Sequence, residues 1–599
     1  MMREKIKALI LDLDIIKSRY VGDFILDFSV IPSENPIQGD YSSNVAFVYV
    51  RDLARAMKAH TGNVLRPMGG ELLPETPHNF AEKIKRELGG KEIDFIERIE
   101  VANPGFLNFF IAEKTIFEKL NEILARPENW GTSEIGRGKT VMVEYFQLNI
   151  AKRPHIGHIR SAIIGDALKR MLLSQGYHAV SDTHVGDWGT QFGILLLGYK
   201  EGGRDLHTQK IVGDPFGALE EIYVQENARI AKNPTRREEA KKEFAKLEQG
   251  DQENRKIWQW MVEVSMKNLE TSAQHLGLLP FDEHCGESFY EDKMQPIVDL
   301  ALEKGIAKKT DDSAIIVDLV ADSLDEAVLI KSDGASTYLL RDLATIQYRK
   351  EQWKFWKNLY VVDVRQSHHF RQVFRVAELL GFEGEGKSEH VGYGFMRLPE
   401  GMMSTRAGTI ISLEKVLDEA IAKARTIIQE KNPMLADTDK VAHTVGIGAL
   451  KYFDLSHHRN SDIIFSWDRT LSFEGNTGPY LQYTYARLRS ILRKANLQLA
   501  TYYNSQLKTE MDSLERQLCV TLLRFPEAIE DALAILSPHV LAGHLYEFAK
   551  TVNEFYHTHP VLQEEDEGKK QFRLTLVFLT TETLKRGLYL LGIDAPEEM

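Results

Sequence analysis

The 599-residue chain has only two cysteines, no long hydrophobic run and no long run of Lys or Arg. Cys285 and Cys519 lie far apart, so they form neither a disulfide framework nor a cysteine-based zinc site. No apolar stretch approaches the roughly 18 residues that suggest a membrane span. Asp12 and Asp14 interrupt the first apolar stretch, which is unlike a signal peptide. We therefore expect a cytoplasmic protein that does not associate with membranes.

The charge balance also limits the possible partners. The net charge is −13, which on its own argues against a nucleic-acid binder. A polynucleotide partner would have to meet a basic surface that forms only on folding. Hydrophobic residues make up 43% and charged residues 27% of the chain, as in ordinary globular proteins. Its length predicts three or four domains.

The stretch from Lys139 to Gly176 carries the strongest local pattern. Residues 140–146 are rich in Val, Tyr and Phe and predict a strand, while apolar residues from Ile159 to Leu172 recur at helical spacing. Gly176 suits a helix C-cap, and residues 177–182 suit a returning strand. The pattern is that of a βαβ unit, which places a helix N-terminus at the carboxyl end of a strand, where phosphate is favoured.

Two histidines stand where this loop becomes helix. His155 and His158 are separated by Ile156 and Gly157, and the glycine lets a nucleotide approach the backbone closely. Surface or capping histidines are one alternative. A metal site is another, but no third ligand lies at helical spacing and no cysteine pair supports it. The strand before the histidines and the helix after them favour two donors that converge on one phosphate.

These residues resemble a known family. The sequence His155-Ile-Gly-His158 is similar to the HIGH signature of class I aminoacyl-tRNA synthetases, and residues 149–161 resemble the arginyl-tRNA synthetases in particular. The resemblance covers nearly the whole chain and is weakest over residues 200–310. It implies ATP and L-arginine as substrates, tRNA(Arg) as partner, Mg²⁺ as cofactor, no protein-bound metal site and a monomer.

The resemblance also implies the domain organisation. We expect an α/β Rossmann-like catalytic domain with an N-terminal α+β domain and an all-α C-terminal domain. The expected boundaries are 1–113 for the N-terminal domain that contacts the tRNA elbow, 114–138 for a linker, 139–415 for the catalytic domain with a helical insertion at about 200–280, 416–470 for a connecting helical segment and 471–599 for the anticodon-binding domain.

A second motif lies further along the chain, at 399–408. As an isolated Gly-flanked stretch it would be an ordinary loop, but its position after the HIGH-like site resembles the KMSKS signature in a form that ends Ser404-Thr405-Arg406. Met402 stands where the first lysine is expected, and Lys152 is the natural substitute. The resemblance implies that ATP is bound by His155, Gly157, His158, Met403, Ser404, Thr405 and Arg406, and that His155, His158, Lys152 and Arg406 are catalytic.

Arginine selection requires carboxylates in register with a planar guanidinium. Tyr338 and Asp342 lie one helical turn apart, and Gln366 follows an apolar run, 359–364, of buried-strand type. Matched to the family, Glu144, Asn149, Tyr338, Asp342 and Gln366 bind arginine. For Asp342 the alternative is an ordinary salt bridge to a neighbour such as Arg341.

Two rival functions remain at this stage. One is a shorter type of HIGH-superfamily enzyme that attaches AMP to another acceptor, against which the helical C-terminal third argues. The other is a tRNA-binding paralogue without catalysis, against which His155, His158 and the expected arginine pocket argue, while Met402 argues slightly for it.

Overall fold

The computed structural model describes residues 1–17, 26–33, 35–58, 76–203, 213–384, 386–397, 412–496 and 509–599. The chain divides into two compact units. Unit 1 comprises Met1–Gly131, Arg487–Asp531 and His544–Leu584, and unit 2 comprises Thr132–Ala486, Ala532–Gly543 and Lys585–Met599. The domain boundaries expected from the sequence remain predictions. Among the described residues, no helix is both long and apolar enough to cross a membrane.

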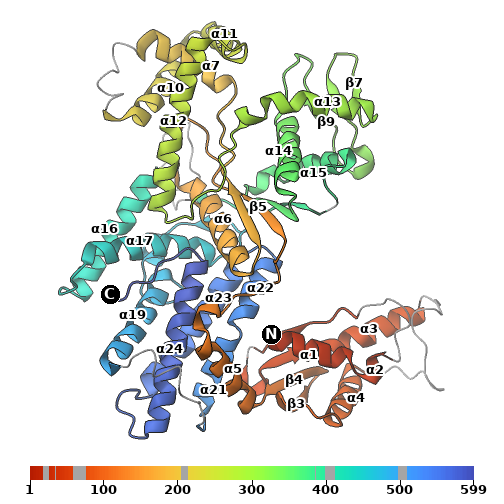
Figure 1. The fold of residues 1–599 in the computed structure, drawn as a ribbon, viewed down its shortest axis with the longest axis vertical. Coiled ribbons are helices and arrows are strands. Elements are labelled where there is room, and N and C mark those ends of the chain that lie inside the picture. The colour runs from red at the N-terminus through yellow and green to blue at the C-terminus, as the bar shows by residue number, and fades with distance from the viewer. Residues whose placement is uncertain are drawn as a thin grey trace. The chain divides into compact units, whose positions relative to one another are not determined.

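Unit 1 begins with a small α+β module (Figure 1). Its antiparallel sheet has the order β1-β2-β4-β3. The rings of Tyr49 and Phe80, on two of its helices, stack 3.8 Å apart and join these helices in the core. The elements are β1 (Val30–Pro32), β2 (Tyr41–Ser43), β3 (Ile96–Ala102), β4 (Phe106–Ile111), α1 (Met2–Leu11), α2 (Asp14–Lys17), η1 (Pro36–Gln38), α3 (Val45–Lys58) and α4 (Pro77–Gly89).

Helices complete unit 1. The Arg516 guanidinium binds both carboxylate oxygens of the buried Asp40, at 2.8 and 2.7 Å, and so ties helix α21 to the small sheet. The helical elements are α5 (Glu113–Ala125), η2 (Pro127–Asn129), α21 (Ser513–Leu523), α22 (Phe525–Ala534), α23 (His539–Thr558) and α24 (Glu567–Leu590), the last three of which contribute residues to both units.

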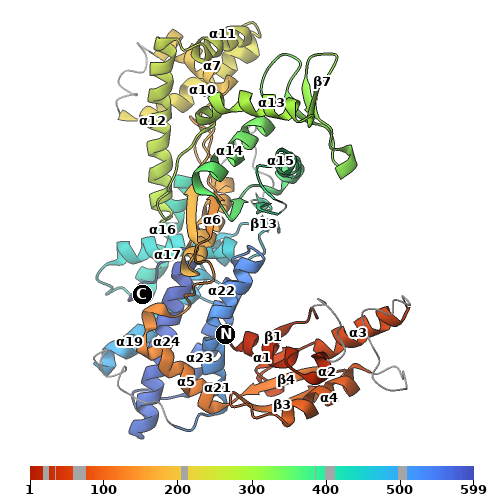
Figure 2. The same cartoon turned by 45° about the vertical axis from the view of Figure 1, so that its right-hand side comes forward.

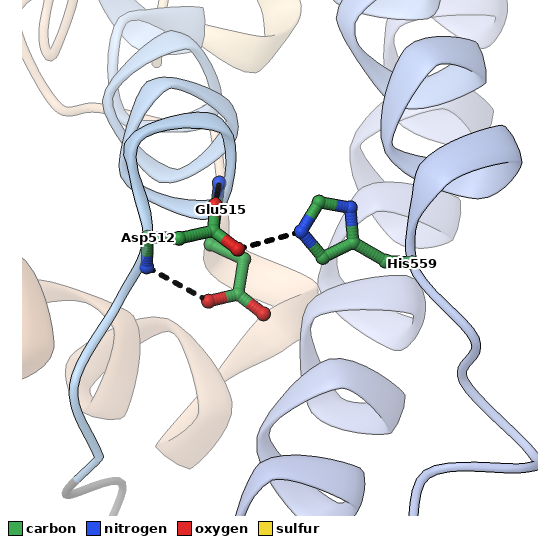
Figure 3. A group of neighbouring side chains, drawn as sticks. All are labelled: Asp512, Glu515 and His559. Atoms are coloured by element: carbon green, nitrogen blue, oxygen red, sulfur yellow. Dashed lines mark hydrogen bonds and ion pairs between the residues drawn. The ribbon is translucent and has the colours of Figure 1, made fainter.

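The start of α21 brings together Asp512, Glu515 and His559 (Figure 3). Asp512 and Glu515 form a reciprocal capping box, and the second oxygen of Asp512 accepts from His559 Nε2 at 2.6 Å. The other oxygen of Glu515 accepts from Arg573 Nε at 2.7 Å. Because every carboxylate oxygen of the group already accepts a hydrogen bond, the group stabilises the helix start.

A four-stranded parallel sheet with the order β11-β10-β5-β6 organises unit 2. Helix α6 connects β5 to β6, as the βαβ pattern predicts, and lies against them in both views (Figures 1 and 2). The elements are β5 (Thr140–Glu144), α6 (Ile156–Ser174), β6 (His178–Asp182), α14 (Tyr338–Trp353), β10 (Lys357–Tyr360), η6 (Val364–Gln366), α15 (Ser367–Leu380) and β11 (Ser388–His390).

Helix α6 is buried on nearly all sides, so its charged residues need partners. Its ion pairs are Arg160 with Asp454 at 2.9 Å, Lys169 with Asp282 at 2.7 Å and Arg170 with Asp166 at 2.7 Å. Arg160 also donates to the backbone oxygens of Gly394 and Ser461. These contacts fix the helix, and therefore its N-terminus, relative to neighbouring segments of unit 2.

The sheet is interrupted in sequence by an insertion, as expected. Its first part is helical, with α7 (Thr190–Gly198), η3 (Tyr199–Gly203), α10 (Pro215–Lys232), α11 (Arg236–Glu248) and α12 (Gln252–His275). A small antiparallel sheet follows, with η4 (Glu287–Lys293), α13 (Met294–Glu303), β7 (Ala307–Lys309), β8 (Ile315–Val317), η5 (Val320–Asp322) and β9 (Ala327–Ile330). After the parallel sheet come β12 (Met396–Arg397), α16 (Leu413–Lys431), α17 (Thr438–Leu455), β13 (Ile463–Ile464), α18 (Trp467–Thr470) and α19 (Gly478–Ala495).

Two strands of the parallel sheet are shorter than the sequence predicts. The expected strand 140–146 ends at Glu144, and Phe146 has a φ of 61°, which breaks the extended backbone. The expected strand 359–364 ends at Tyr360. In both cases the residues that follow line a cavity at the carboxyl ends of the strands, where open α/β sheets bind ligands.

Candidate active site

A cavity of about 680 Å³ lies in unit 2, where the carboxyl ends of β5 and β10 meet the N-terminus of α6. Strand ends, helix starts and the segment before β12 all contribute to its lining. The polar and charged side chains of the lining include Glu144, Asn149, His155, His158, His184, Glu287, Tyr338, Arg341, Asp342, Asp363, Arg365, Gln366 and His369.

The two histidines of the HIGH-like motif are held by the backbone. His155 is the N-cap of α6, and its Nδ1 accepts from the N–H of Gly157 at 3.1 Å. The N–H of His155 in turn donates to Nδ1 of His158 at 3.1 Å, and the ring centres lie 3.8 Å apart. Because both Nδ1 atoms are acceptors, each neutral ring carries its proton on Nε2. The motif therefore presents two Nε2–H donors beside a helix N-terminus.

The histidines remain neutral near pH 7. Burial lowers the pKa of His155. Burial, with His155 and Lys152 nearby, lowers the pKa of His158 to about 3. Neutral N–H donors and the positive end of the α6 dipole are suited to a polyanion such as a triphosphate.

Helix α14 and its neighbours contribute side chains that suit a cation and not an anion. Tyr338 stands at the first position of α14 and is 70% exposed, and Asp342 follows one turn later. His369 Nε2, in the first turn of α15, donates to Asp342 Oδ2 at 2.5 Å. Gln366 ends the short helix η6 and also lines the cavity. The lining thus offers a carboxylate, a phenol and an amide to a cationic ligand.

Two arginines of the chain hold further acids of the cavity. Arg349 is fully buried and donates to Glu144 at 2.6 Å and to Asp182 at 2.8 Å, which lie opposite each other at the ends of β5 and β6. Glu144 also accepts from Gln147 at 3.2 Å. Arg341 pairs with Glu287 at 3.2 Å. The acidic lining is therefore oriented by internal guanidinium groups.

Family models match almost the entire chain. The catalytic domain of class I tRNA synthetases (R) matches residues 119–467, the DALR anticodon-binding domain residues 481–599, and the arginyl-tRNA synthetase N-terminal domain residues 2–111. The chain belongs to the arginyl-tRNA synthetase family. The resemblance read from the sequence and the expected fold class are both confirmed.

Individual relatives agree with the family models. The arginine–tRNA ligase of Fusobacterium nucleatum is 37% identical over 96% of this chain and 95% of its own length, and that of Clostridioides difficile is 40% identical over 83% and 86%. Among solved structures, the arginyl-tRNA synthetase of Plasmodium falciparum has a TM-score of 0.81 and 26% identity, covering 100% of this chain and 99% of its own. That of Thermus thermophilus has a TM-score of 0.80 and 26% identity, with both chains fully covered.

The structure brings most of the expected synthetase site residues together. Glu144, Asn149, His155, Gly157, His158, Tyr338, Asp342 and Gln366 all line the one cavity. The lining also leaves no room for a Cβ at Gly186, next to the Asn149 amide. Asp342 is paired with His369 and not with the region of Arg341, which was the alternative.

Other expected residues do not join this group. Lys152 is not part of the lining, and its Nζ lies 5.7 Å from the ring centre of Tyr223 in the helical insertion. Its catalytic role remains a prediction. Met402, Met403, Ser404, Thr405 and Arg406 lie outside the described residues, so their roles also remain predictions.

The sequence did not point to several lining residues of this synthetase. Glu287 begins a short helix within the insertion, His369 follows another histidine in an ordinary helix, and His184 follows β6 with a φ of 39°. None belongs to a motif with informative spacing. The available signal for His184 is the three glycines that follow it, Gly186, Gly189 and Gly193, because closely spaced glycines are typical of a tight loop near a ligand.

Proposed function

We propose that this protein is an arginine–tRNA ligase whose activation step takes place in the cavity lined by His155 and Asp342. The enzyme activates L-arginine with ATP to arginyl-adenylate and transfers the arginyl group to the 2′-hydroxyl of the terminal adenosine of tRNA(Arg). The observation that carries the proposal is the convergence, on one cavity, of two neutral imidazole donors and an acid beside a phenol.

In the first step the carboxylate of arginine attacks the α-phosphorus of ATP, and pyrophosphate leaves. Negative charge grows on the phosphorus oxygens and on the leaving group, so positioned donors lower the barrier. His155 and His158 supply Nε2–H donors whose rings do not need to reorient, because backbone N–H groups hold them. We propose that Lys152 and Arg406 also stabilise this negative charge. Gly157 and residues 403–406 would bind ATP.

The second step releases AMP. The 2′-hydroxyl of the terminal adenosine attacks the arginyl carbonyl, and the adenylate phosphate departs with its electron pair. The proton of the hydroxyl passes to the leaving phosphate or to solvent. The all-α C-terminal domain would bind the anticodon, and the N-terminal domain would contact the tRNA elbow.

We assign arginine recognition to Glu144, Asn149, Tyr338, Asp342 and Gln366. Asp342 would bind the guanidinium with Tyr338 beside it, while Glu144, held by Arg349, and Asn149 would face the α-amino and carboxylate end. A site built to pair with a planar cation rejects neutral analogues, because one oxygen of its acid would then lack a hydrogen-bond donor.

The described lining residues do not fit a dedicated Mg²⁺ site. Each of the four lining carboxylates already accepts from an arginine or a histidine: Glu144, Glu287, Asp342 and Asp363. We propose that Mg²⁺ enters on the phosphates of ATP, which with water supply its oxygen ligands. A monomeric state and a cytoplasmic location are part of the same proposal.

A charging assay tests this function. Purified protein is incubated with ATP, labelled arginine and tRNA(Arg) that ends in adenosine, 2′-deoxyadenosine or 3′-deoxyadenosine. We expect charging of the normal and the 3′-deoxy tRNA and none of the 2′-deoxy tRNA. Charging of the 2′-deoxy tRNA would refute the assigned acceptor, and failure to charge any tRNA would refute the function.

A further inference from the structure

Among the described carboxylates of the cavity, Asp342 is paired with a histidine, and the others are paired with arginines. The other three are each joined to an arginine of the chain: Glu144 to Arg349, Glu287 to Arg341 and Asp363 to Arg365. Asp342 is joined to a histidine, with Nε2 of His369 2.5 Å from its Oδ2. Among the described residues, no donor reaches the second oxygen, Oδ1.

This difference decides which acid can receive a cationic substrate. An arginine side chain is permanently charged, so it offsets part of the negative charge of each carboxylate bound to it. Arg349 does this for Glu144 and Asp182, and Arg341 for Glu287 and Glu291. The His369 imidazole donates from one nitrogen to a single oxygen of Asp342, whereas an arginine fork can engage both oxygens of a carboxylate. Asp342 therefore keeps one oxygen, Oδ1, for an incoming guanidinium.

The imidazole is itself held in place. Its ring packs edge-on against Phe370, with the ring centres 5.4 Å apart at 71°, and Phe370 is buried. The side chain of His369 is 28% exposed and that of Asp342 is 18% exposed. A fixed donor on one oxygen sets the plane of the carboxylate, and a planar guanidinium fork requires that plane to be defined.

We propose that His369 is a positioning residue for arginine, which acts through Asp342 by orienting its carboxylate and leaving Oδ1 to the substrate. The inference rests on the proposed role of Asp342 in arginine binding. It assigns to His369 an effect on the KM for arginine, not on ATP and not on the chemical step.

The adjacent histidine provides a matched control. His368 pairs with Asp325 at 3.3 Å, and neither residue lines the cavity. The test variants are His369→Phe, which keeps a ring against Phe370 but has no donor, and His369→Gln, whose amide nitrogen reaches about as far as Nε2. His369→Ala replaces the phenylalanine variant if that one does not fold.

Arginine-dependent exchange of pyrophosphate into ATP, in the presence of tRNA, measures the effect. We expect His369→Phe to raise the KM for arginine about tenfold, with the KM for ATP and kcat within about twofold, because the substitution removes only the hydrogen bond that orients Asp342. His369→Gln should recover most of the affinity, and His368→Ala should match the wild type.

Three results would overturn the proposal: an unchanged KM for arginine in His369→Phe, an equal rise in the KM for ATP, or a glutamine variant no better than phenylalanine. Asp342→Ala, measured alongside, separates this from failure of the proposed function. If Asp342→Ala raises the KM for arginine and His369→Phe does not, only the role of His369 fails. If Asp342→Ala has no effect on the KM for arginine, the role of His369 and the proposed role of Asp342 in arginine binding both fail. In the double variant, His369→Phe should add less than about twofold to Asp342→Ala.

Discussion

The cavity combines two sets of side chains that are held in different ways. The histidine pair, His155 and His158, comes from four consecutive residues, and backbone N–H groups fix both rings. The acidic set, Glu144, Glu287 and Asp342, comes from a strand end, a short helix in the insertion and α14. Each of its members is fixed by a side chain from elsewhere in the chain.

The difference separates two kinds of function. Donors that a helix N-terminus positions are suited to any polyphosphate, and class I synthetases share them. Acids that are positioned by side chains can be arranged for one amino acid. We therefore expect the histidine pair to control the rate of activation and the acidic set to control the choice of amino acid. Four measurements test whether these two functions are separate.

The largest effect is expected on stability, when Arg349, the arginine that holds Glu144, is replaced. Arg349→Met leaves Glu144 and Asp182 buried without their cation, which typically costs about 3–5 kcal/mol. The first thermal unfolding transition should fall by at least about 6 °C. Arg365→Met is the control, because Arg365 is 69% exposed and its pair with Asp363 contributes little. An equal fall of the transition temperature in both variants would show that the buried ion pairs of Arg349 stabilise the protein no more than the exposed pair does.

The next effect concerns the rate. His158→Asn keeps an acceptor at the position of Nδ1, and so the capping contact, but removes the Nε2–H donor. The kcat for pyrophosphate exchange should fall ~10²–10³-fold, as for other preorganised donors, with the KM for arginine little changed. His158→Gln keeps an N–H near the position of Nε2 and should recover part of the rate. A large rise in the KM for arginine in His158→Asn would contradict the division.

The complementary effect concerns amino-acid binding. Asp342→Ala should raise the KM for arginine about 10²-fold and the KM for ATP only slightly, since removing one member of a hydrogen-bonded charge pair costs about 2–5 kcal/mol. Steady-state exchange kinetics with each substrate varied gives both constants. Asp325→Ala, whose carboxylate is 88% exposed and outside the cavity, should behave as the wild type. Equal changes in both KM values would exclude a specific role for Asp342 in arginine binding.

The last prediction is that the contribution of His158 to kcat does not change with pH. Since burial lowers the pKa of His158 to about 3, its imidazole remains neutral from pH 8 down to pH 6. The ratio of kcat for the wild type to that for His158→Asn, in which the amide does not titrate, should stay within about twofold over this range. A ratio that falls with a midpoint near pH 6.5 would mean that His158 has an ordinary pKa.

The same contrast explains what could be predicted from the sequence. The βαβ unit and the place of His155 and His158 at the start of its helix follow from consecutive residues, because hydrophobic period, glycine placement and helix capping are local. Tyr338 and Asp342 could be paired by helical spacing, but their place in the cavity required the family resemblance. His369 and Glu287 could not be predicted, since their approach to the cavity depends on how α15 and the insertion pack. The strand ends were placed too late, because Phe146 and the residues after Tyr360 look apolar in the sequence, yet the regular strands end at Glu144 and Tyr360.

The central claim is that one cavity holds both the donors for ATP and the acid for arginine. The most direct test is pyrophosphate exchange by the wild-type protein with arginine, lysine or citrulline, each with and without tRNA(Arg). We predict exchange that depends on arginine and is strongest with tRNA, with little or none for lysine and citrulline. Exchange that is equal for arginine and citrulline, or absent with arginine and tRNA together, would contradict the account.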